Sequence, residues 1–394
     1  MTLLDLIERS ERQLIEAGVS FGHGTTCAFD EAAWLVLWQL GLPLDTPLDG
    51  PDSAADQDIP AAQQAQVEAL LVQRISSRKP AAYLTHEAWL QGVPFYVDER
   101  SIVPRSLIAE LLVNDSLDVW FSQPPQRVLD LCTGNGSLAV LAAMTLPDAQ
   151  ITGADLSHDA LAVARINVDR HGLSDRIELV ASDGLSASAV QSRGPFDLIV
   201  CNPPYVNADS MAQLPPEYLA EPELALHGGA DGMDFIRTLL QQAPAQMAHG
   251  AVLVLEIGHE RVHFEAAFPN LDVVWLETSA GEDQVLLITR EALLATAWTF
   301  KPVQSEQDYA LFSSLLQEYA QHDLADPANS TIWSDLQSLP KRYGPPQGFA
   351  MLAYHGTSLA GCGALAPTQQ AGLAEIKRLY VRDDFRRQGF ARRV

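Results

Sequence analysis

Four consecutive residues in this sequence, Asn202-Pro203-Pro204-Tyr205, have the side chains and the spacing to grip a planar nitrogen group. The apolar run before them, Phe196–Val200, is typical of a buried strand. The prolines end that strand because neither donates a backbone N–H. Asn202 is therefore expected at the carboxyl end of a strand, where carbonyl oxygens can accept N–H bonds while the Tyr205 ring stacks on the bound group. For this motif alone, a strand-ending turn capped by asparagine is an equal alternative.

A glycine-rich turn upstream would let the backbone approach a ligand closely. It follows a predicted strand, Arg127–Leu131, and precedes a predicted helix, Ser137–Thr145. Alone, such a turn is a weak signal for nucleotide binding. The residues at this turn that we place in a candidate site are Asp130, Thr133, Gly134, Asn135 and Gly136.

Acidic residues after the next two strands strengthen that interpretation. Asp155, followed by Leu156, is expected at the end of the second strand, where a carboxylate accepts hydrogen bonds from a ribose diol. Asp183 follows the third strand and could meet an adenine amino group. A diphosphate would be repelled by Asp130 and Asp155, whereas a cationic sulfonium would be favoured. A doubly wound domain with incidental acids is the alternative.

Alternating strands and helices are predicted to position these residues. The repeated strand–helix units imply a mostly parallel sheet with helices on both faces, which is an α/β fold. Upstream, Pro60 is expected to open a helix, and Asp30 is expected to cap a helix over Glu31–Leu40. The remaining predicted strands are Gln150–Ala154, Arg176–Val180, Ala251–Ile257, Asp272–Leu276 and Gln284–Thr289, and the remaining predicted helices are Leu107–Val119, His158–Arg170, Asp234–Met247 and Glu260–Phe268.

Composition and charge restrict the class of protein. The chain has 394 residues and a net charge of −25, and residues 291–394 hold 10 basic and 10 acidic residues, so residues 1–290 carry the whole excess. A field of that sign repels phosphate backbones and attracts basic proteins; acidity that only keeps an enzyme soluble is the alternative. The four cysteines form no Cys-x-x-Cys pair, so we expect no metal site and a reducing, cytoplasmic compartment. We expect no membrane span and no signal peptide.

These motifs together resemble those of class I S-adenosylmethionine-dependent methyltransferases. Further blocks resemble the glutamine N5-methyltransferase family: D-L-C-T-G-N-G-S, A-D-L-S-x-D-A-L, N-P-P-Y, E-P-x-L-A-L-x-G-G-x-D-G and L-E-I-G. The region Arg78–Leu111 is similar to the branch of that family that methylates ribosomal protein L3, and the likeness extends over residues 1–290.

The resemblance implies a Rossmann-like, seven-stranded mixed sheet that binds S-adenosylmethionine. It implies that Asn202 and a proline carbonyl, from Pro203 or Pro204, bind the substrate amide while Tyr205 packs on it. The cofactor-binding residues that it implies are Asp130, Thr133, Gly134, Asn135, Gly136, Asp155, Leu156, Asp183 and Asn202.

Two other substrates stay open. Release factor glutamine methylation is the closer alternative. An adenine-N6 nucleic-acid methyltransferase uses the same grip on a flipped base, but a nucleic-acid binder is expected to carry a basic footprint. Lys79 is the only lysine in residues 1–290, so direct nucleic-acid binding is not expected. Ribosomal protein L3 is basic, and an acidic enzyme suits it.

Two features near the motif have two interpretations each. An acidic, glycine-rich stretch, Glu221–Leu224 with Gly228–Gly232, is expected to form a mobile lid, and a plain long connection is the alternative. Arg105 could hold a carboxylate or cap a turn, and the sequence favours the cap.

The C-terminal residues resemble part of a second enzyme family. Arg386-Arg387-Gln388-Gly389-Phe390-Ala391 follows a predicted strand and resembles the acyl-CoA pyrophosphate loop of GNAT N-acetyltransferases, in which backbone N–H groups and arginines suit a phosphate. The later strands of such a domain do not follow, so we expect an incomplete domain that would bind acetyl-CoA only if complete. A docking module is the alternative.

The predicted domain organisation has five parts. They are a helical substrate-recognition domain (1–82), a β-hairpin connector (83–105), a methyltransferase domain (106–290), a linker (291–299) and an incomplete GNAT-like α/β domain (300–394).

Overall fold

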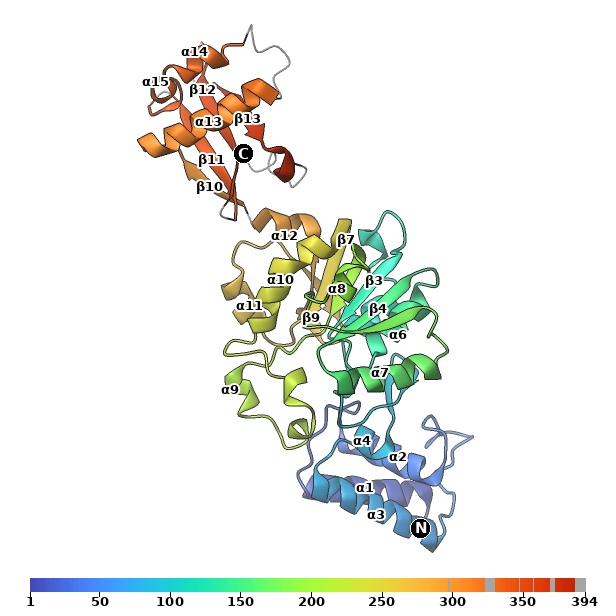
Figure 1. Cartoon of the computed structure of the whole chain (residues 1–394). Helices are drawn as coiled ribbons and strands as arrows, with labels where there is room; N and C mark the ends of the chain where they lie inside the picture. Colours follow the sequence, from blue (N-terminus) through green and yellow to red (C-terminus); the bar gives the residue numbers. More distant parts are fainter. Residues whose placement is uncertain (297, 323–329, 347, 357, 369–372, 387–394) are drawn as a thin grey trace. The chain divides into compact units, whose positions relative to one another are not determined.

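The computed structural model describes residues 1–296, 298–322, 330–346, 348–356, 358–368 and 373–386. The chain forms two compact units (Figure 1). The first unit spans Met1–Pro269 and Val273–Arg290, and the second spans Asn270–Asp272 and Glu291–Val394. Within the described ranges, no helix combines the length and the apolar character needed to cross a bilayer.

Four helices form a bundle at the start of the first unit: α1 (Leu3–Glu16), α2 (Ala28–Leu40), α3 (Ala61–Ser77) and α4 (Ala81–Thr85). A capping box begins α1, because the Thr2 side chain accepts from the Asp5 N–H and the Asp5 carboxylate accepts from the Thr2 N–H. Two predicted helix starts were wrong. Helix α2 begins at Ala28 and holds Asp30 in its first turn, and Pro60 is the N-cap of α3 instead of its first residue.

A hairpin and a short helix follow the bundle: β1 (Ala88–Leu90), β2 (Val93–Phe95), α5 (Ile108–Val113) and the 3-10 turn η1 (Asp118–Trp120). The helix predicted over Leu107–Val119 was too long. Asn114 ends α5, and Asp115 then adopts a φ of 55°, a left-handed conformation that an α-helix cannot continue.

Seven strands form the central sheet of the first unit, in the order β5-β4-β3-β6-β7-β9-β8. Neighbouring strands from β5 to β7 are parallel, and β9 is antiparallel to both of its neighbours. The order reverses between β3 and β6, and a sheet of this kind binds ligands in the crevice at that point. The strands are β3 (Arg127–Leu131), β4 (Gln150–Asp155), β5 (Ile177–Ala181), β6 (Phe196–Cys201), β7 (Met247–Glu256), β8 (Val274–Thr278) and β9 (Gly281–Thr289). The predicted α/β fold with a mixed, seven-stranded sheet is confirmed.

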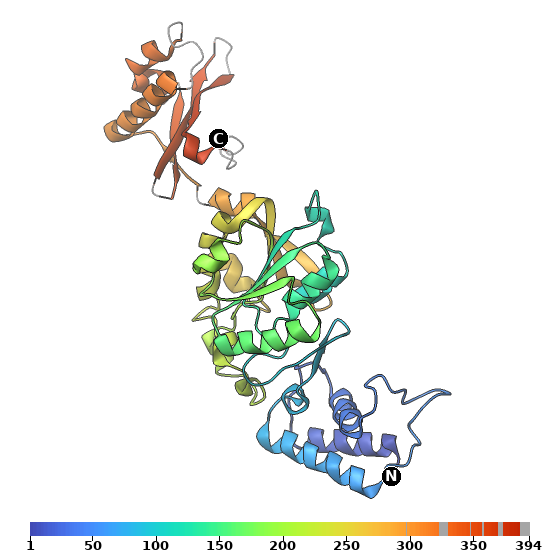
Figure 2. The same ribbon diagram turned by 45° about the vertical axis from the view of Figure 1, so that its right-hand side comes forward.

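Helices cover both faces of this sheet, with α6 and α7 on one face and α10 and α11 on the other (Figures 1 and 2). Central strands are therefore mostly apolar, and β6 is buried from Leu198 to Cys201. The helices are α6 (Ser137–Thr145), α7 (His158–Arg170), α8 (Ser188–Gln191), α10 (Asp234–Gln246) and α11 (Arg261–Ala267), and the segment between β6 and α10 contains α9 (Ala208–Met211), η2 (Tyr218–Ala220) and η3 (Glu223–Ala225).

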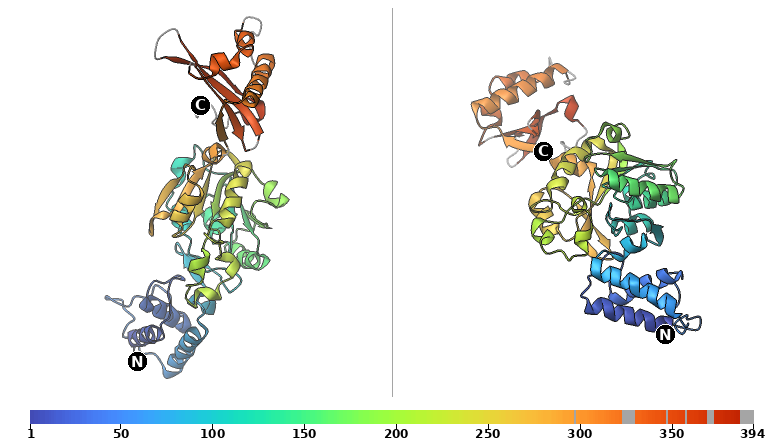
Figure 3. Two further views of the ribbon diagram at one scale, coloured as in Figure 1. Left: turned by 90° about the vertical axis from the view of Figure 1, so that its left-hand side faces the viewer. Right: turned by 60° about the horizontal axis from the view of Figure 1, so that its bottom comes forward.

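The second unit contains an antiparallel four-stranded sheet in the order β10-β11-β12-β13. Helix α13 lies against this sheet (Figure 3). Its side chains Phe312, Leu315 and Leu316 belong to the apolar core of this unit. The expected linker at 291–299 instead contains most of α12 and the first residues of β10. The elements are α12 (Arg290–Thr296), β10 (Trp298–Pro302), α13 (Glu306–His322), α14 (Ile332–Leu336), α15 (Leu339–Tyr343), β11 (Phe349–His355), β12 (Ser358–Pro367), β13 (Ala374–Val381) and η4 (Asp383–Phe385).

Candidate active site

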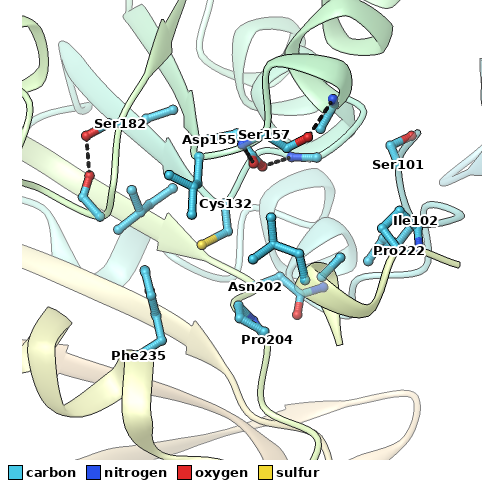
Figure 4. Close-up of a pocket in the computed structure, with 18 of the residues that line it drawn as sticks. Ser101, Ile102, Cys132, Asp155, Ser157, Ser182, Asn202, Pro204, Pro222 and Phe235 are labelled. Carbon is cyan, nitrogen blue, oxygen red and sulfur yellow. Dashed lines mark hydrogen bonds between the residues drawn. The ribbon is translucent and has the colours of Figure 1, made fainter. Parts of the chain in front are cut away.

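A cavity lies at the carboxyl ends of β3, β4 and β6, where a sheet of this kind binds its ligands. Figure 4 shows Asn202 and Pro204 facing the same space as Cys132 and Asp155. The strand order of the sheet brings these segments together, although they lie up to about seventy residues apart in the sequence. Six residues predicted for the site line this cavity: Gly134, Asp155, Leu156, Asp183, Asn202 and Pro204.

The conformation of the glycine turn after β3 depends on contacts with Asp155 and with helix α7. Gly134 has a φ of 56°, and its N–H donates to Asp155 Oδ2 over 2.9 Å. Gly136 has a φ of 80°, and a Cβ built there would lie 3.0 Å from the Cβ of Ala164 in α7. Glycine is therefore needed at the first position for the turn and at the second for the close approach of α7.

Asp130 lies behind this turn. Its side chain is fully buried, and Oδ2 accepts hydrogen bonds from the Thr133 hydroxyl and from the Ala139 N–H. Oδ1 has no hydrogen-bond partner among the described residues, and burial raises the pKa of the carboxyl to about 7. Asp130 therefore stabilises the turn through its hydrogen bonds to Thr133 and Ala139. It is not among the residues that line the cavity.

Thr133, Asn135 and Gly136 are likewise parts of the turn outside the cavity lining. A residue that sequence reasoning missed, Asn167 of α7, donates to the Asn135 carbonyl over 2.8 Å. The same side chain bonds both the N–H and the carbonyl of Tyr96. Asn167 thus joins the glycine turn to the hairpin region, and its mid-helix position gave no sequence signal for this role.

The carboxylate of Asp155 is fixed by backbone donors. Oδ1 accepts from the Ser157 N–H over 2.8 Å, and Oδ2 accepts from the Gly134 N–H. Burial raises the pKa of this carboxyl despite those bonds. Each oxygen keeps a second lone pair for a ligand in the cavity.

Three glycines enclose Tyr205, the aromatic residue of the motif. A Cβ at Gly228 would lie 2.7 Å from the Tyr205 Cα, one at Gly232 would lie 2.2 Å from its carbonyl oxygen, and one at Gly258 would lie 2.6 Å from its ring. The sequence blocks that contain these glycines therefore have a packing role, because no larger residue fits against Tyr205 without moving it. Tyr205 itself is not part of the cavity lining.

Glu256, at the end of β7, is a second residue that sequence reasoning did not place. Its Oε2 accepts from the Ser106 hydroxyl over 2.5 Å and from the Leu107 N–H over 2.9 Å. Burial raises the pKa of Tyr205, and the nearby Glu256 carboxylate raises it further. Glu256 thus stands between the Tyr205 hydroxyl and the segment that enters α5.

The segment after the motif is fastened at its base. The Val206 N–H donates to the Leu226 carbonyl over 2.8 Å, and the Gly228 N–H donates back to the Val206 carbonyl over 2.9 Å. Asn207 also donates to Glu260 over 2.7 Å. Pro222, Leu224 and Ala225 of this segment form one wall of the cavity. The segment therefore completes the cavity, and its movement as a lid stays a prediction.

Arg105 holds a carboxylate, contrary to the cap that the sequence favoured. Its Nη1 and Nη2 donate to the two oxygens of Glu221 over 2.6 and 2.7 Å. This bidentate pair links the connector to the loop after the motif. Burial acts to raise the pKa of Glu221, but the guanidinium of Arg105 and the neighbouring His23 outweigh it and lower the pKa to about 2.

This pair predicts a pH dependence of stability. The folded-state pKa of Glu221 lies below its usual 4.5, so its contribution is present above about pH 5 and is lost as the pH falls toward 2. The shift corresponds to about 3 kcal/mol. In denaturant titrations, Glu221→Gln should therefore be less stable than wild type near neutral pH, and the difference should shrink in acid. The exposed Glu223→Gln is the control; a difference that stays constant with pH contradicts the assignment.

The residues predicted for an acyl-CoA loop are mostly outside the described ranges. Arg387, Gln388, Gly389 and Ala391 lie there. Arg386 is described, and its side chain donates to the Val381 carbonyl over 2.8 Å and pairs with Asp383. The described part of this loop therefore carries one arginine that is engaged within the chain.

Comparison with known proteins finds matches to two separate regions of the chain. The family model "Methyltransferase small domain" matches residues 109–231, and "Acetyltransferase (GNAT) family" matches residues 310–394. A ribosomal protein uL3 glutamine methyltransferase of Bordetella pertussis is 51% identical over 74% of this chain and 96% of its own length. Proteins of the same name from Burkholderia pseudomallei and Neisseria meningitidis serogroup B are 49% and 48% identical, over 75% and 74% of this chain and 97% and 94% of their own lengths. The predicted resemblance is confirmed: the chain belongs to the family of ribosomal protein uL3 glutamine methyltransferases and carries a GNAT-type region after it.

Proposed function

We propose that this chain transfers a methyl group from S-adenosylmethionine to the side-chain amide nitrogen of a glutamine in ribosomal protein uL3. The observation that carries the proposal is a single cavity lined by Asn202 together with Gly134 and Asp155. The substrate named for the relatives supplies the acceptor. The cytoplasm, where ribosomal proteins are made, is the compartment that this substrate implies.

The residues of the cavity fit the proposed methyl donor. Gly134 offers a close backbone approach, and Asp155 and Asp183 offer carboxylates for a ribose diol and an adenine amino group. Carboxylates also favour a positively charged ligand over a diphosphate. When bound, S-adenosylmethionine supplies an electrophilic methyl group on a positively charged sulfur.

Asp155→Asn is expected to lower the affinity for S-adenosylhomocysteine by about 10- to 100-fold, because the ligand loses a hydrogen bond to a charged acceptor. Isothermal titration calorimetry measures this affinity without turnover. The control is Asp159→Asn, which changes an exposed acid in the adjacent helix α7. Equal affinities of wild type and Asp155→Asn would remove Asp155 from the binding site.

The chain's own groups account for activation of a poor nucleophile. An amide nitrogen reacts slowly because its lone pair is delocalised into the carbonyl. The side-chain oxygen of Asn202 and the carbonyl of Pro203 would accept its two N–H bonds and aim the nitrogen. Those acceptors become stronger partners as the nitrogen gains positive charge, so they stabilise the transition state more than the ground state. The nitrogen then releases one proton to solvent, and no strong base is needed.

The aromatic ring of Tyr205 would complete this grip by packing against the flat amide. Its enclosure by three glycines and the carboxylate of Glu256 limits its movement. A fixed ring keeps the nitrogen in line with the reacting methyl group, which is a positioning effect.

A transfer assay with three acceptors tests the proposed substrate. The protein and labelled S-adenosylmethionine are incubated with purified uL3, a release factor or duplex DNA. We expect label in uL3 alone, in agreement with a net charge of −25 that attracts basic proteins. Label in the release factor or in DNA instead would establish one of the alternative substrates.

We also propose a role for each of the other parts of the chain. We propose that residues 1–82 recognise the protein substrate, that 83–105 connect this part to the methyltransferase domain at 106–290, and that residues 300–394 form the GNAT-type region. Acetyl-CoA binding stays a prediction that depends on the loop at 386–391.

A further inference from the structure

A cluster of ionisable residues, all buried except the partly exposed Arg105, joins the N-terminal helical bundle to the loop after the Asn-Pro-Pro-Tyr motif. We call it the ionisable cluster. The bundle contributes His23, Glu31 and Arg74, the loop contributes Glu217 and Glu221, and the connector contributes Arg105. None of these residues is assigned a role by the proposed reaction.

Arg74 of α3 is the centre of the cluster and is fully buried. Its Nε donates to Glu31 Oε1 over 2.8 Å within the bundle, and its Nη1 reaches Glu217 Oε1 over 3.5 Å in the loop. Arg78, one turn further along the chain, also reaches Glu217 Oε1, over 3.2 Å. Removing one partner of a buried ion pair is strongly unfavourable, because the other charge is left uncompensated. The loop is therefore fastened to the bundle at Glu217.

A second contact follows four residues later in the loop. His23 is 3% exposed, and its Nε2 lies 3.4 Å from Glu221 Oε2 without a hydrogen bond between them. The His23 ring also packs on Tyr218 with ring centres 4.2 Å apart. A Cβ at Gly22 would lie only 2.4 Å from the Tyr218 hydroxyl oxygen. The bundle segment Gly22-His23 thus fits closely around Tyr218.

Glu217 and Glu221, which contact the bundle, come just before the residues that form one wall of the cavity. Glu221 is followed by Pro222, and Pro222, Leu224 and Ala225 line the cavity. The other face of Glu221 is held by Arg105 and by the Val103 N–H, which donates to Oε1 over 2.9 Å. A shift of Glu217 or Glu221 would therefore move the wall that faces Asn202.

We propose that the helical bundle positions the substrate side of the active site, and that Gly22, His23, Arg74 and Glu217 are positioning residues that act through the loop wall at 222–225. The expected effect on methyl transfer rests on the proposed function. The expected effect of the bundle on the conformation of the loop does not. The bundle thereby has a second task besides any contact with the protein substrate.

Two variants at the edge of the cluster test this proposal in the full-length protein. His23→Ala removes the ring that packs on Tyr218, and Glu217→Gln removes a buried charge while keeping the side-chain shape. The matched control is Arg9→Gln, which breaks the Arg9–Glu68 pair between α1 and α3 in the same bundle and does not touch the loop. His23→Gln is the conservative variant, because it restores a polar side chain opposite Glu221.

Hydrogen–deuterium exchange of residues 207–226 is the first measurement. We expect the backbone amides of this loop to exchange roughly tenfold faster in His23→Ala and Glu217→Gln, with α1 and α3 unchanged. His23→Gln should recover only part of the protection, because it restores a polar group opposite Glu221 but not the ring on Tyr218. The second measurement is methyl transfer to uL3, for which we expect kcat/KM to fall by about 10²-fold while the affinity for S-adenosylhomocysteine stays the same.

The two measurements separate two kinds of failure. If loop exchange in both variants equals that of wild type or of Arg9→Gln, the positioning role is overturned, whatever the activity. If wild type does not methylate uL3, the proposed substrate fails, and the exchange result still decides whether the bundle orders the loop. A fall in S-adenosylhomocysteine affinity that matches the fall in kcat/KM would also overturn the proposal, because it would place the effect on the donor side.

Discussion

Replacing Asn202 with alanine is expected to abolish methyl transfer while leaving the affinity for S-adenosylhomocysteine within about twofold of wild type. Asn202 lines the cavity at the end of β6, and its proposed task is to accept an N–H bond that strengthens as the nitrogen gains charge. Loss of one preorganised group of this kind costs about 10²–10³ in rate. Here the same group also orients the nucleophile, so the loss should lie at or beyond the upper end of that range.

The measurement for this variant is single-turnover transfer to uL3 with saturating donor, together with calorimetric titration of S-adenosylhomocysteine. Asn114→Ala is the control, since Asn114 is an exposed asparagine at the end of α5. Wild-type turnover by Asn202→Ala would end the proposed mechanism. A parallel loss of donor affinity would show that Asn202 serves the donor and not the amide.

Gly232→Ala is expected to disrupt the site through the backbone of Tyr205. The new Cβ would lie 2.2 Å from the Tyr205 carbonyl oxygen, and a backbone atom cannot move away as a flexible side chain can. The residue also has a φ of 78°, where alanine is strained by about 1–2 kcal/mol. Overpacking adds a further 1–3 kcal/mol, and displacement of Tyr205 should lower kcat/KM by about 10²-fold.

Gly172→Ala is the control that separates the steric clash with Tyr205 from the backbone strain of an alanine at positive φ. Gly172 has a φ of 67°, and a Cβ there meets nothing within 4 Å. It should therefore show the strain alone, with a small loss of stability and full activity. Thermal denaturation and uL3 methylation of both variants give the comparison. Equal behaviour of Gly232→Ala and Gly172→Ala would mean that the contact with Tyr205 does not constrain the site.

The sequence predicted the bounds of helices and strands best where short-range patterns determine them. The strand predicted at Arg127–Leu131 and the helices at Ser137–Thr145 and His158–Arg170 have the same bounds in the structure, because hydrophobic periodicity and flanking glycines report on local conformation. The helix that ends early at Asn114 shows the limit. The left-handed conformation of Asp115 depends on its surroundings, and no glycine marks it.

In the site, too, the sequence predicted the features that follow from local motifs and missed those that depend on tertiary contacts. The sequence motifs predicted that Gly134, Asp155 and Asn202 would meet at one crevice, since the carboxyl ends of parallel strands share an edge, and all three line the cavity. The roles assigned to these residues stay predictions. The pairs Arg105–Glu221 and Ser106–Glu256 connect residues more than a hundred positions apart. Such contacts leave no periodic signal, because they depend on tertiary packing.

The central claim is that a glutamine side-chain nitrogen is held at the Asn202-Pro203-Pro204-Tyr205 turn and receives the methyl group there. Fragmentation mass spectrometry of uL3 peptides, after incubation with the full-length protein and S-adenosylmethionine, tests it most directly. We predict one added methyl group on the side-chain nitrogen of a single glutamine, absent when Asn202→Ala replaces the wild type. A methyl group on lysine, on a carboxylate or on the backbone, or unmodified uL3, would contradict the account.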